Sequence, residues 1–373
     1  MTVMKDKQIL KQSIGLDVSK STVAVCFSQR EGGKSGKAFR VISSKTFSTT
    51  GAGFKQLDAW IAKQRDKSVD LHLLMEATGV YYEELAYFLH GKAYTVSVLL
   101  PNKTAAFAKS LDEKSKNDKA DARKLAQMSL ERDLPVWTPP DATMLTIKRL
   151  CRERAELVHE KTAFTNRLHA KTHAHEPEKS SVKRGKDALK FLKKQIKEIE
   201  DEIEALVEKD PVLKKKIANV CSVKGIGLVT AATVISEANG FILFKNKAQL
   251  VSYAGYDVVE NTSGNKVISP EKISKRGNYR IRRALHFPAL VAVKYNPEFD
   301  NLRQRVFDNT KITMKGYVAV QRKLLVLIYT LYKNDTVFQP NFAHANNTTT
   351  PNGRVTKKQT RQTQKNRQEL SPA

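Results

Sequence analysis

Apolar residues in the first third of the chain alternate between short strand-like runs and helix-like spacings. The predicted elements are strands at 14–18, 22–28 and 41–48, a helix at 53–65, a strand at 71–75, a helix at 81–89 and a strand at 94–100. Continuous or alternating apolar residues indicate the strands, and apolar positions three or four apart indicate the helices. Three strands followed by strand–helix–strand alternation predict an α/β domain over residues 1–135, with a mixed sheet flanked by helices.

A regular apolar seam follows in residues 136–210. In its second half the apolar positions step by three and four, through Leu189, Leu192, Ile196, Ile199, Ile203 and Leu206. The first half keeps this spacing but places basic Arg154 and Lys161 in the seam. The bend between the halves is marked by Pro177, Ser180, Ser181 and Gly185. We interpret the segment as a helical coiled-coil hairpin, which serves either as a spacer or as an arm for dimerisation or RNA contact.

The remaining chain divides into a helical domain and a polar tail. Residues 211–335 are predicted to form a mostly α-helical domain with a loop centred on 261–270. Residues 336–373 are rich in Thr, Asn, Gln, Lys and Arg and contain few apolar side chains. Such a composition cannot build a core, so this tail is predicted to be disordered.

The net charge of the chain indicates which class of molecule it binds. The chain carries 65 basic and 38 acidic side chains, a formal charge of +27, which favours a polyanion, nucleic acid before anionic membrane. Residues 211–335, with 21 basic and 8 acidic side chains, should carry most of the binding surface. No apolar run approaches the ~18 residues of a membrane span. Three well-separated cysteines without CxxC spacing predict neither disulfides nor thiolate zinc, and favour a cytoplasmic protein.

Four carboxylates of the first domain occupy unusual positions. Asp17 lies inside an apolar strand, Glu76 ends another, and Asp118 and Asp121 are three residues apart in a predicted helix. Each alone has an ordinary explanation, as a turn, a cap or a surface side chain. Together, on this order of strands and helices, they are typical of ribonuclease-H-like nucleases, in which converging carboxylates hold two magnesium ions roughly 4 Å apart. Oxygen ligands favour magnesium over zinc.

Two patterns in the second half suggest contact with phosphates. Residues 223–231 resemble the hairpin of a helix-hairpin-helix module, in which Gly225 and Gly227, beside Lys224, would let backbone N–H groups approach a phosphate. An ordinary turn between helices is the alternative. A dense basic patch then follows, containing Lys275, Arg276, Arg280, Arg282 and Arg283. Such a patch suits neutralisation of several DNA or RNA phosphates.

These residues belong to seven blocks that together resemble one family. The chain resembles the DEDD-type transposases of bacterial insertion sequences, the "one-ten" group that includes the Piv DNA invertases and the bridge-RNA-guided recombinases. The resemblance runs from about residue 14 to residue 333. It covers residues 15–17, 75–81, 116–122, 225–227, 263–264, 274–278 with 282–283, and 322–324. The order of the blocks makes the match specific.

The resemblance implies a RuvC-like domain whose metal-binding DEDD residues are Asp17, Glu76, Asp118 and Asp121. It also implies a C-terminal transposase domain with a nucleophilic serine, which maps onto Ser263; Ser269 and Ser274 are alternatives on the same stretch. In such a composite site, magnesium polarises the phosphate that the serine attacks, forming a covalent protein–DNA link. Relatives act as tetramers, with a structured non-coding RNA that pairs with target and donor DNA. We therefore expect this chain to form a homo-oligomer, from dimer to tetramer, in the bacterial cytoplasm in association with the nucleoid.

Three hypotheses about function follow. The first is an RNA-guided, magnesium-dependent serine recombinase that acts on DNA. The alternative is a RuvC-like endonuclease or junction resolvase that uses water as the nucleophile, with a merely structural Ser263. The third is a nucleic-acid-binding scaffold without catalysis. A covalent protein–DNA adduct separates the first two hypotheses, and metal-dependent cleavage separates both from the third.

Overall fold

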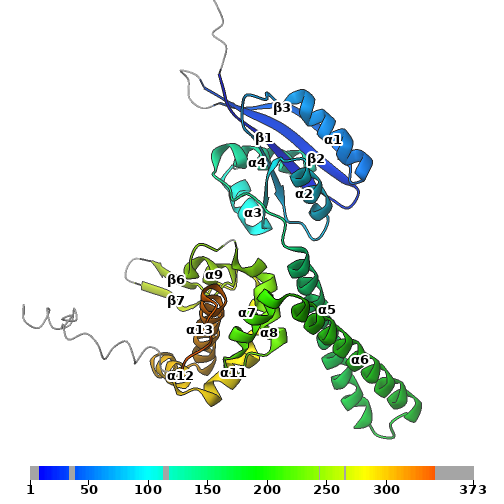
Figure 1. Cartoon of the computed structure of the whole chain (residues 1–373), viewed down its shortest axis with the longest axis vertical. Helices are drawn as coiled ribbons and strands as arrows, with labels where there is room; N and C mark the ends of the chain where they lie inside the picture. The colour runs from blue at the N-terminus through cyan, green and yellow to red at the C-terminus, as the bar shows by residue number, and fades with distance from the viewer. Residues whose placement is uncertain (1–7, 33–37, 112–116, 243, 264–265, 341–373) are drawn as a thin grey trace, which may run out of the picture. The chain divides into compact units, whose positions relative to one another are not determined.

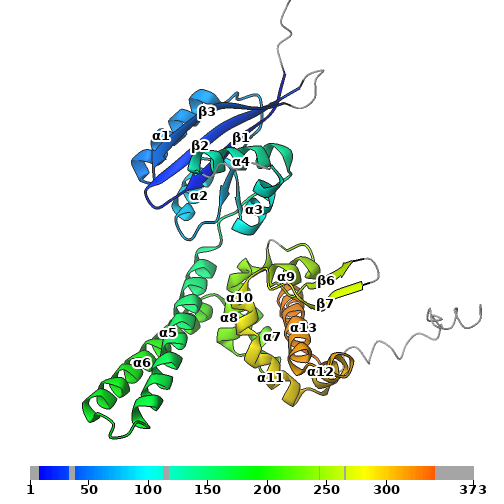
Figure 2. The ribbon, with the colours of Figure 1, turned by 180° about the vertical axis from the view of Figure 1, so that it is seen from behind.

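The computed structural model describes residues 8–32, 38–111, 117–242, 244–263 and 266–340. The chain splits between Pro139 and Pro140 into two compact units. Figure 1 shows the N-terminal unit in blue to cyan and the C-terminal unit from green to orange, and Figure 2 shows both from behind. The predicted tail from residue 341 onward lies outside the described residues.

The N-terminal unit is built on one five-stranded sheet. Its strands are β1 (Ile9–Val18), β2 (Thr22–Glu31), β3 (Ala38–Ser48), β4 (Leu71–Glu76) and β5 (Thr95–Leu99). They lie in the order β3-β2-β1-β4-β5. The first three strands are antiparallel, and β4 and β5 continue the sheet in parallel with β1. The predicted mixed sheet is confirmed, although β1 begins five residues earlier than the apolar run that indicated it.

Helices cover both faces of this sheet. They are α1 (Gly51–Gln64), α2 (Tyr82–Gly91), α3 (Pro101–Ser110) and α4 (Asp118–Glu131). Side chains alternate between the faces of a strand, so Ile14, Leu16 and Val18 pack into the core beneath α1 and α2. The opposite face packs against α4, through a second core that contains Leu74 and Leu125. Residues such as Asp17 and Glu76, which alternate with the apolar positions, therefore point to the α4 face.

The C-terminal unit begins with the predicted hairpin, formed by α5 (Ala142–Thr172) and α6 (Lys179–Lys209). The bend is shorter than expected, because α6 already contains Ser180, Ser181 and Gly185. Glu178 caps the start of α6 by accepting a hydrogen bond from the Ser180 backbone, which fixes the helix start ahead of these residues. The buried seam of α6 comprises Leu192, Ile196, Ile199, Ile203 and Val207.

Basic Arg154 is accommodated in the seam of α5 by a charge on the facing helix. Its guanidinium lies 2.6 Å from the carboxylate of Glu200 on α6, and both side chains remain about 30% exposed. The interruption of the apolar seam is therefore a cross-helix ion pair in a partly solvated setting.

The rest of the unit is a helical bundle that buries α13. It contains α7 (Pro211–Cys221), α8 (Leu228–Glu237), the short 3₁₀ helix η1 (Asn239–Phe241), α9 (Lys247–Tyr253), α10 (Tyr279–Ala284), α11 (His286–Tyr295), α12 (Pro297–Thr310) and α13 (Thr313–Asn334). Leu324, Leu325 and Ile328 of α13 are fully buried in one large core. None of the helices in the described part of the chain is long and apolar enough to cross a membrane.

The loop expected at 261–270 is instead a β-hairpin, formed by β6 (Val258–Ser263) and antiparallel β7 (Lys266–Ile273) (Figure 1). The polar composition Asn-Thr-Ser-Gly-Asn hid these strands, because their pairing comes from backbone hydrogen bonds and not from an apolar face.

Candidate active site and nucleic-acid interface

The sheet places Asp17 and Glu76 on neighbouring strands. Leu16 of β1 pairs with Met75 of β4 in parallel register, so Asp17 and Glu76 each lie one residue beyond a paired position. Both strands run in the same direction, and both carboxylates therefore emerge at the same edge and face of the sheet. Sequence reading predicted each strand but not this register.

Helix α4 brings the other two carboxylates to the same face. Asn117 caps the helix by accepting a hydrogen bond from the Ala120 backbone at 2.9 Å, so the helix begins at Asp118. Asp118 and Asp121 then fall in its first turn, three residues apart and on one side. Small side chains let α4 lie close to the sheet, where Ala122 and Ala126 pack against Ala24 and Cys26 of β2.

The other three carboxylates lie near enough to Asp17 for their charges to act on it. Burial, followed by the negative charges of Asp118, Asp121 and Glu76 in that order, raises the pKa of Asp17 to about 6. A carboxylate so destabilised by its neighbours is typical of a site that holds a cation. The predicted DEDD residues therefore gather around Asp17.

Two further side chains hold members of the cluster. Thr104, buried on α3, donates a hydrogen bond from Oγ1 to Oε2 of Glu76. Lys124, buried on α4, donates from Nζ to Oδ1 of Asp121 at 2.9 Å. Neither residue was identified from the sequence. Pro101 starts α3 directly after β5 and so places Thr104 beside the sheet edge, a signal visible only once strand and helix are in place.

The donor chemistry of this cluster fits a divalent cation, because carboxylate oxygens are hard ligands and their mutual repulsion is relieved by positive charge. No three Asp, Glu, His or Cys side chains among the described residues are close enough to ligate a single ion. One oxygen of Glu76 and one of Asp121 instead accept hydrogen bonds from side chains of the protein.

The predicted serine lies in the other unit. The backbone places Ser263 at the end of β6, opposite Lys266 across the turn. Ser269 stands on β7 opposite Asn261. Ser274 lies beyond the hairpin, where its Oγ accepts a hydrogen bond from the Arg276 backbone at 3.3 Å. Of the three serines, Ser263 alone is at the hairpin tip.

The motif after the hairpin packs against the turn before it. The backbone N–H of Ser274 donates to Asp257, that of Lys275 to Gly255, and that of Asn278 to Tyr253. The approach is close: a Cβ on Gly277 would lie 2.4 Å from the Tyr253 carbonyl oxygen. Lys275 adopts a left-handed conformation, with φ at +54°. Residues 253–257 and residues 274–278 are thus joined by backbone hydrogen bonds at the base of the β6–β7 hairpin. We call these two joined segments the clasp.

The basic residues of this region divide into structural and exposed ones. Arg282 donates from Nη1 to the Ala254 carbonyl at 2.7 Å and so supports the clasp. Arg276 and Arg283 are exposed, as is Lys275, so their charges are available to a polyanion. The predicted patch therefore exists, but two of its arginines, Arg282 and Arg280, also contact groups of the fold.

Buried Glu237 organises this region and was missed from the sequence. Its carboxylate, 1% exposed, accepts two hydrogen bonds from Arg152 on α5, at 2.6 and 3.0 Å, and one from Asn278 at 2.8 Å. Burial acts to raise the pKa of Glu237, but the bonds and charge of Arg152 lower it below its usual value. Arg280 lies 3.9 Å away. Asn278 also caps α10. The buried carboxylate of Glu237 therefore links α10 to Arg152 on α5 of the helical hairpin.

The glycine turn connects α7 to α8. Gly225 has φ at +100°, and a Cβ there would lie 3.0 Å from the Pro288 carbonyl of α11, so the position requires glycine. Gly227 precedes α8 in open space, which leaves the first N–H groups of that helix accessible. Lys224 is exposed, with Nζ 5.8 Å from the Tyr295 ring centroid.

The strand order, with four carboxylates on its α4 face, defines a RuvC-like domain of the ribonuclease-H-like class, joined here to a helical unit. The chain matches two family models, the DEDD transposase model of IS110 elements over residues 14–176 and the model of the transposase IS116/IS110/IS902 family over 217–304. Together these stretches span more than half of the chain. The chain belongs to the IS110 family of DEDD transposases and is a DNA recombinase enzyme.

The chain is also similar to individual proteins. The pilin gene-inverting protein of Moraxella bovis is 26% identical over 334 residues, which cover 88% of this chain and 98% of that protein. The insertion element IS110 uncharacterized 43.6 kDa protein of Streptomyces coelicolor is 23% identical over 41% of this chain and 36% of its own length. The RuvC structure of Thermus thermophilus aligns with 31% of this chain at 13% identity, with a TM-score of 0.24 and 90% of that chain covered.

Proposed function

We propose that this transposase cuts and rejoins DNA through a covalent link between Ser263 and a DNA phosphate. The observation that carries the proposal is the cluster around Asp17, whose pKa is raised to about 6 by burial and by three neighbouring carboxylates. Ser263, at the tip of the β6–β7 hairpin, supplies a hydroxyl on the block that resembles the family's nucleophile. The similarity to the pilin gene-inverting protein supports DNA rearrangement as the outcome.

The chemistry is a pair of phosphoryl transfers. In the first, Oγ of Ser263 bonds to phosphorus, the bond from phosphorus to a deoxyribose oxygen breaks, and the released DNA hydroxyl takes up a proton. In the second, a hydroxyl of the new partner strand attacks, the Ser263–phosphorus bond breaks, and the serine regains its proton. Bond count and charge balance, so neither cofactor oxidation nor nucleotide hydrolysis is needed.

Asp17, Glu76, Asp118 and Asp121 would hold divalent cations, which we propose to be magnesium. When bound, the cations polarise the phosphate and stabilise the leaving oxygen. The carboxylates of this chain then bind and orient the ions, while Thr104 and Lys124 set the positions of Glu76 and Asp121. Release of their hydrogen bonds would let these two carboxylates turn toward an ion.

Nucleic acid is bound, in this proposal, by the exposed part of the basic patch and by the glycine turn. Lys275, Arg276 and Arg283 present free surface charge, and Arg280 lies beside them on α10. Lys224, Gly225 and Gly227 would contact a phosphate at the start of α8. We further propose that a structured non-coding RNA pairs with target and donor DNA, and that the chain works as a dimer or tetramer.

The decisive test uses the serine. Wild type and Ser263→Ala are incubated with magnesium, labelled DNA and RNA transcribed from the non-coding DNA beside the gene, then denatured and examined for labelled protein. We expect an adduct with wild type and none with Ser263→Ala, while both bind DNA equally. Ser269→Ala and Ser274→Ala are the matched controls and should retain the adduct.

Other outcomes have defined meanings. If the adduct persists in Ser263→Ala but disappears in Ser269→Ala or Ser274→Ala, the serine replaced in that control is the nucleophile. Cleavage by wild type and Ser263→Ala alike, without any adduct, rejects the serine mechanism and supports a resolvase that uses water.

A further inference from the structure

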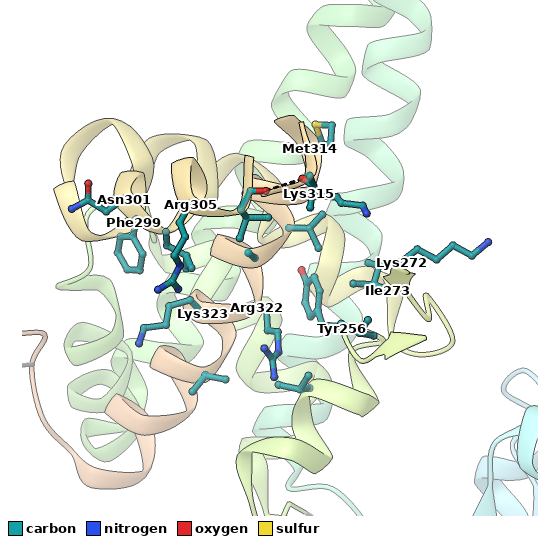
Figure 3. A pocket seen from close by; sticks show the side chains of 18 of the residues that line it. Tyr256, Lys272, Ile273, Phe299, Asn301, Arg305, Met314, Lys315, Arg322 and Lys323 are labelled. Atoms are coloured by element: carbon teal, nitrogen blue, oxygen red, sulfur yellow. Dashed lines mark hydrogen bonds between the residues drawn. The ribbon is translucent and has the colours of Figure 1, made fainter. Parts of the chain in front are cut away.

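A large cavity opens in the C-terminal unit apart from every residue assigned above. It has a volume of about 1120 Å³ and lies among α9, α12, α13 and the base of the β6–β7 hairpin (Figure 3). Val258 and Ile273, the first residue of β6 and the last of β7, both line it. The cavity therefore adjoins the hairpin that carries Ser263 at its other end.

The walls of the cavity are largely apolar. Val251, Phe299, Val318 and Val326 contribute side chains, and the ring of Tyr256 lies among them (Figure 3). The Tyr256 hydroxyl is already used, because it donates a hydrogen bond to buried Gln321 at 2.9 Å. An apolar concavity of this size is typical of a ligand-binding site.

Cations surround these walls. Six basic residues from three helices and one strand line the cavity: Lys247, Lys272, Arg305, Lys315, Arg322 and Lys323. Within the described part of the chain, no ion pair involves any of the six, whereas Arg152, Arg154 and Arg303 are each paired with a carboxylate. Six uncompensated cations repel one another, and a polyanion removes that repulsion.

The combination of apolar walls and cations fits a nucleic-acid strand whose bases are unpaired. A duplex keeps its base faces stacked inside and offers mainly phosphates and groove edges, which leave apolar walls unused. An unpaired strand offers both base faces and phosphates. We propose that this cavity binds a short unpaired segment of a DNA strand, with bases against the walls and phosphates on the six cations. The inference rests on the proposed recombinase function and extends it.

The position of the cavity gives the binding a role in strand exchange. From Val258 to Ser263 the strand extends by roughly 17 Å, at a rise of about 3.4 Å per residue. A strand anchored at the base of the hairpin is thereby held within a few nucleotides of the hairpin tip. Strand exchange needs such unpaired segments, because a duplex must open before its strands are rejoined.

The experiment measures binding by the full-length chain with fluorescence anisotropy. The probes are a mixed-sequence single strand of about 12 nucleotides, an abasic strand of equal length and the matching duplex. Arg322→Ala/Lys323→Ala removes two cations, and Ala319→Trp fills the cavity while keeping all charges. Lys209→Ala/Lys333→Ala, at exposed sites outside the lining, is the charge-matched control. All variants carry Ser263→Ala, so binding is read without chemistry.

We expect the double cation variant to weaken single-strand binding by about tenfold or more while changing duplex binding by less than about threefold. Ala319→Trp should weaken binding of the strand with bases and spare the abasic strand. Equal losses in the control, or equal losses for strand and duplex, overturn the proposal. Displacement of the strand by an acidic amphipathic peptide at lower concentration identifies a peptide site instead. An absent adduct in the serine test leaves these results unchanged, so the two failures are distinguishable.

Discussion

Gly15 of β1 lies directly against the backbone of Ala122 on α4. A Cβ atom at Gly15 would come 1.9 Å from the Ala122 carbonyl oxygen and 2.4 Å from the Ala126 amide nitrogen. Helix α4 therefore approaches the sheet to backbone contact at this point. Asp17, two residues farther along β1, points to the same face, so the contact at Gly15 sets how closely Asp118 and Asp121 approach it.

Gly15→Ala should accordingly separate α4 from the sheet. Because the added methyl meets backbone atoms, relief requires a shift of the helix, and we expect destabilisation of about 3 kcal/mol or more in urea unfolding. Gly51→Ala is the matched control, since a Cβ there meets nothing within 4 Å. Wild-type stability in Gly15→Ala would show that α4 does not rest on β1 in solution.

Asp17 should make stability depend on pH in an unusual direction. Its pKa rises from 3.8 to about 6 on folding, so between these values the folded chain binds a proton that the unfolded chain has lost. Stability from this group is fully present below pH 3.8 and is lost as the pH rises to about 6. In EDTA at high pH, Asp17→Asn should therefore melt above wild type. Asp187→Asn, an exposed site on α6, should leave the melting temperature unchanged.

With magnesium present, wild type should melt at a higher temperature than Asp17→Asn. A cation relieves the repulsion among the four carboxylates, so it should raise the melting temperature of wild type more than that of Asp17→Asn. The same substitution should abolish strand cleavage while leaving DNA binding intact. Cleavage at the wild-type rate by Asp17→Asn in limiting magnesium would reject the DEDD assignment.

The sequence predicted the sheet, the helical hairpin and the four carboxylates because local patterns carry them. Strand and helix periods are visible in short windows, and Asp17 is conspicuous because a charge interrupts an apolar run. Thr104 and Lys124 could not be found this way, since their importance depends on contacts made only after β5 and α3 are packed. The β6–β7 strands were missed because the polar run 261–266 interrupts the apolar pattern and the pairing uses the backbone.

Among the arginines of α10, Arg283 should contribute most to the salt dependence of nucleic-acid binding. Arg282 is bonded to the Ala254 carbonyl, whereas Arg283 is exposed, so their double neutralisation would mix lost phosphate contacts with damage to the clasp. Arg283→Ala alone should reduce the log–log slope of duplex affinity against salt by about one unit, with unfolding unchanged. Arg282→Ala should lower stability as well. An unchanged slope in Arg283→Ala removes this residue from the interface.

Glu237 provides a test of how the basic helix is held. Glu237→Gln keeps the shape of the side chain but leaves Arg152 without its charged partner, and we expect destabilisation of about 2–3 kcal/mol, because Arg152 remains 39% exposed and solvent screens part of the loss. The folded pKa of Glu237 is lowered, so its stabilisation is present above pH 4.5 and is lost as the pH falls through the folded value.

The difference in the free energy of unfolding between wild type and Glu237→Gln, measured with urea, should therefore be large at pH 7 and become smaller as the pH is lowered. Glu204→Gln, an exposed site on α6, is the control and should match wild type at both pH values. If this difference does not change with pH, the shape of the Glu237 side chain, and not its charge, links α5 to α8. Because Asn278 bonds to Glu237 and caps α10, the variant should also weaken nucleic-acid binding at neutral pH, although Glu237 itself is buried away from any ligand.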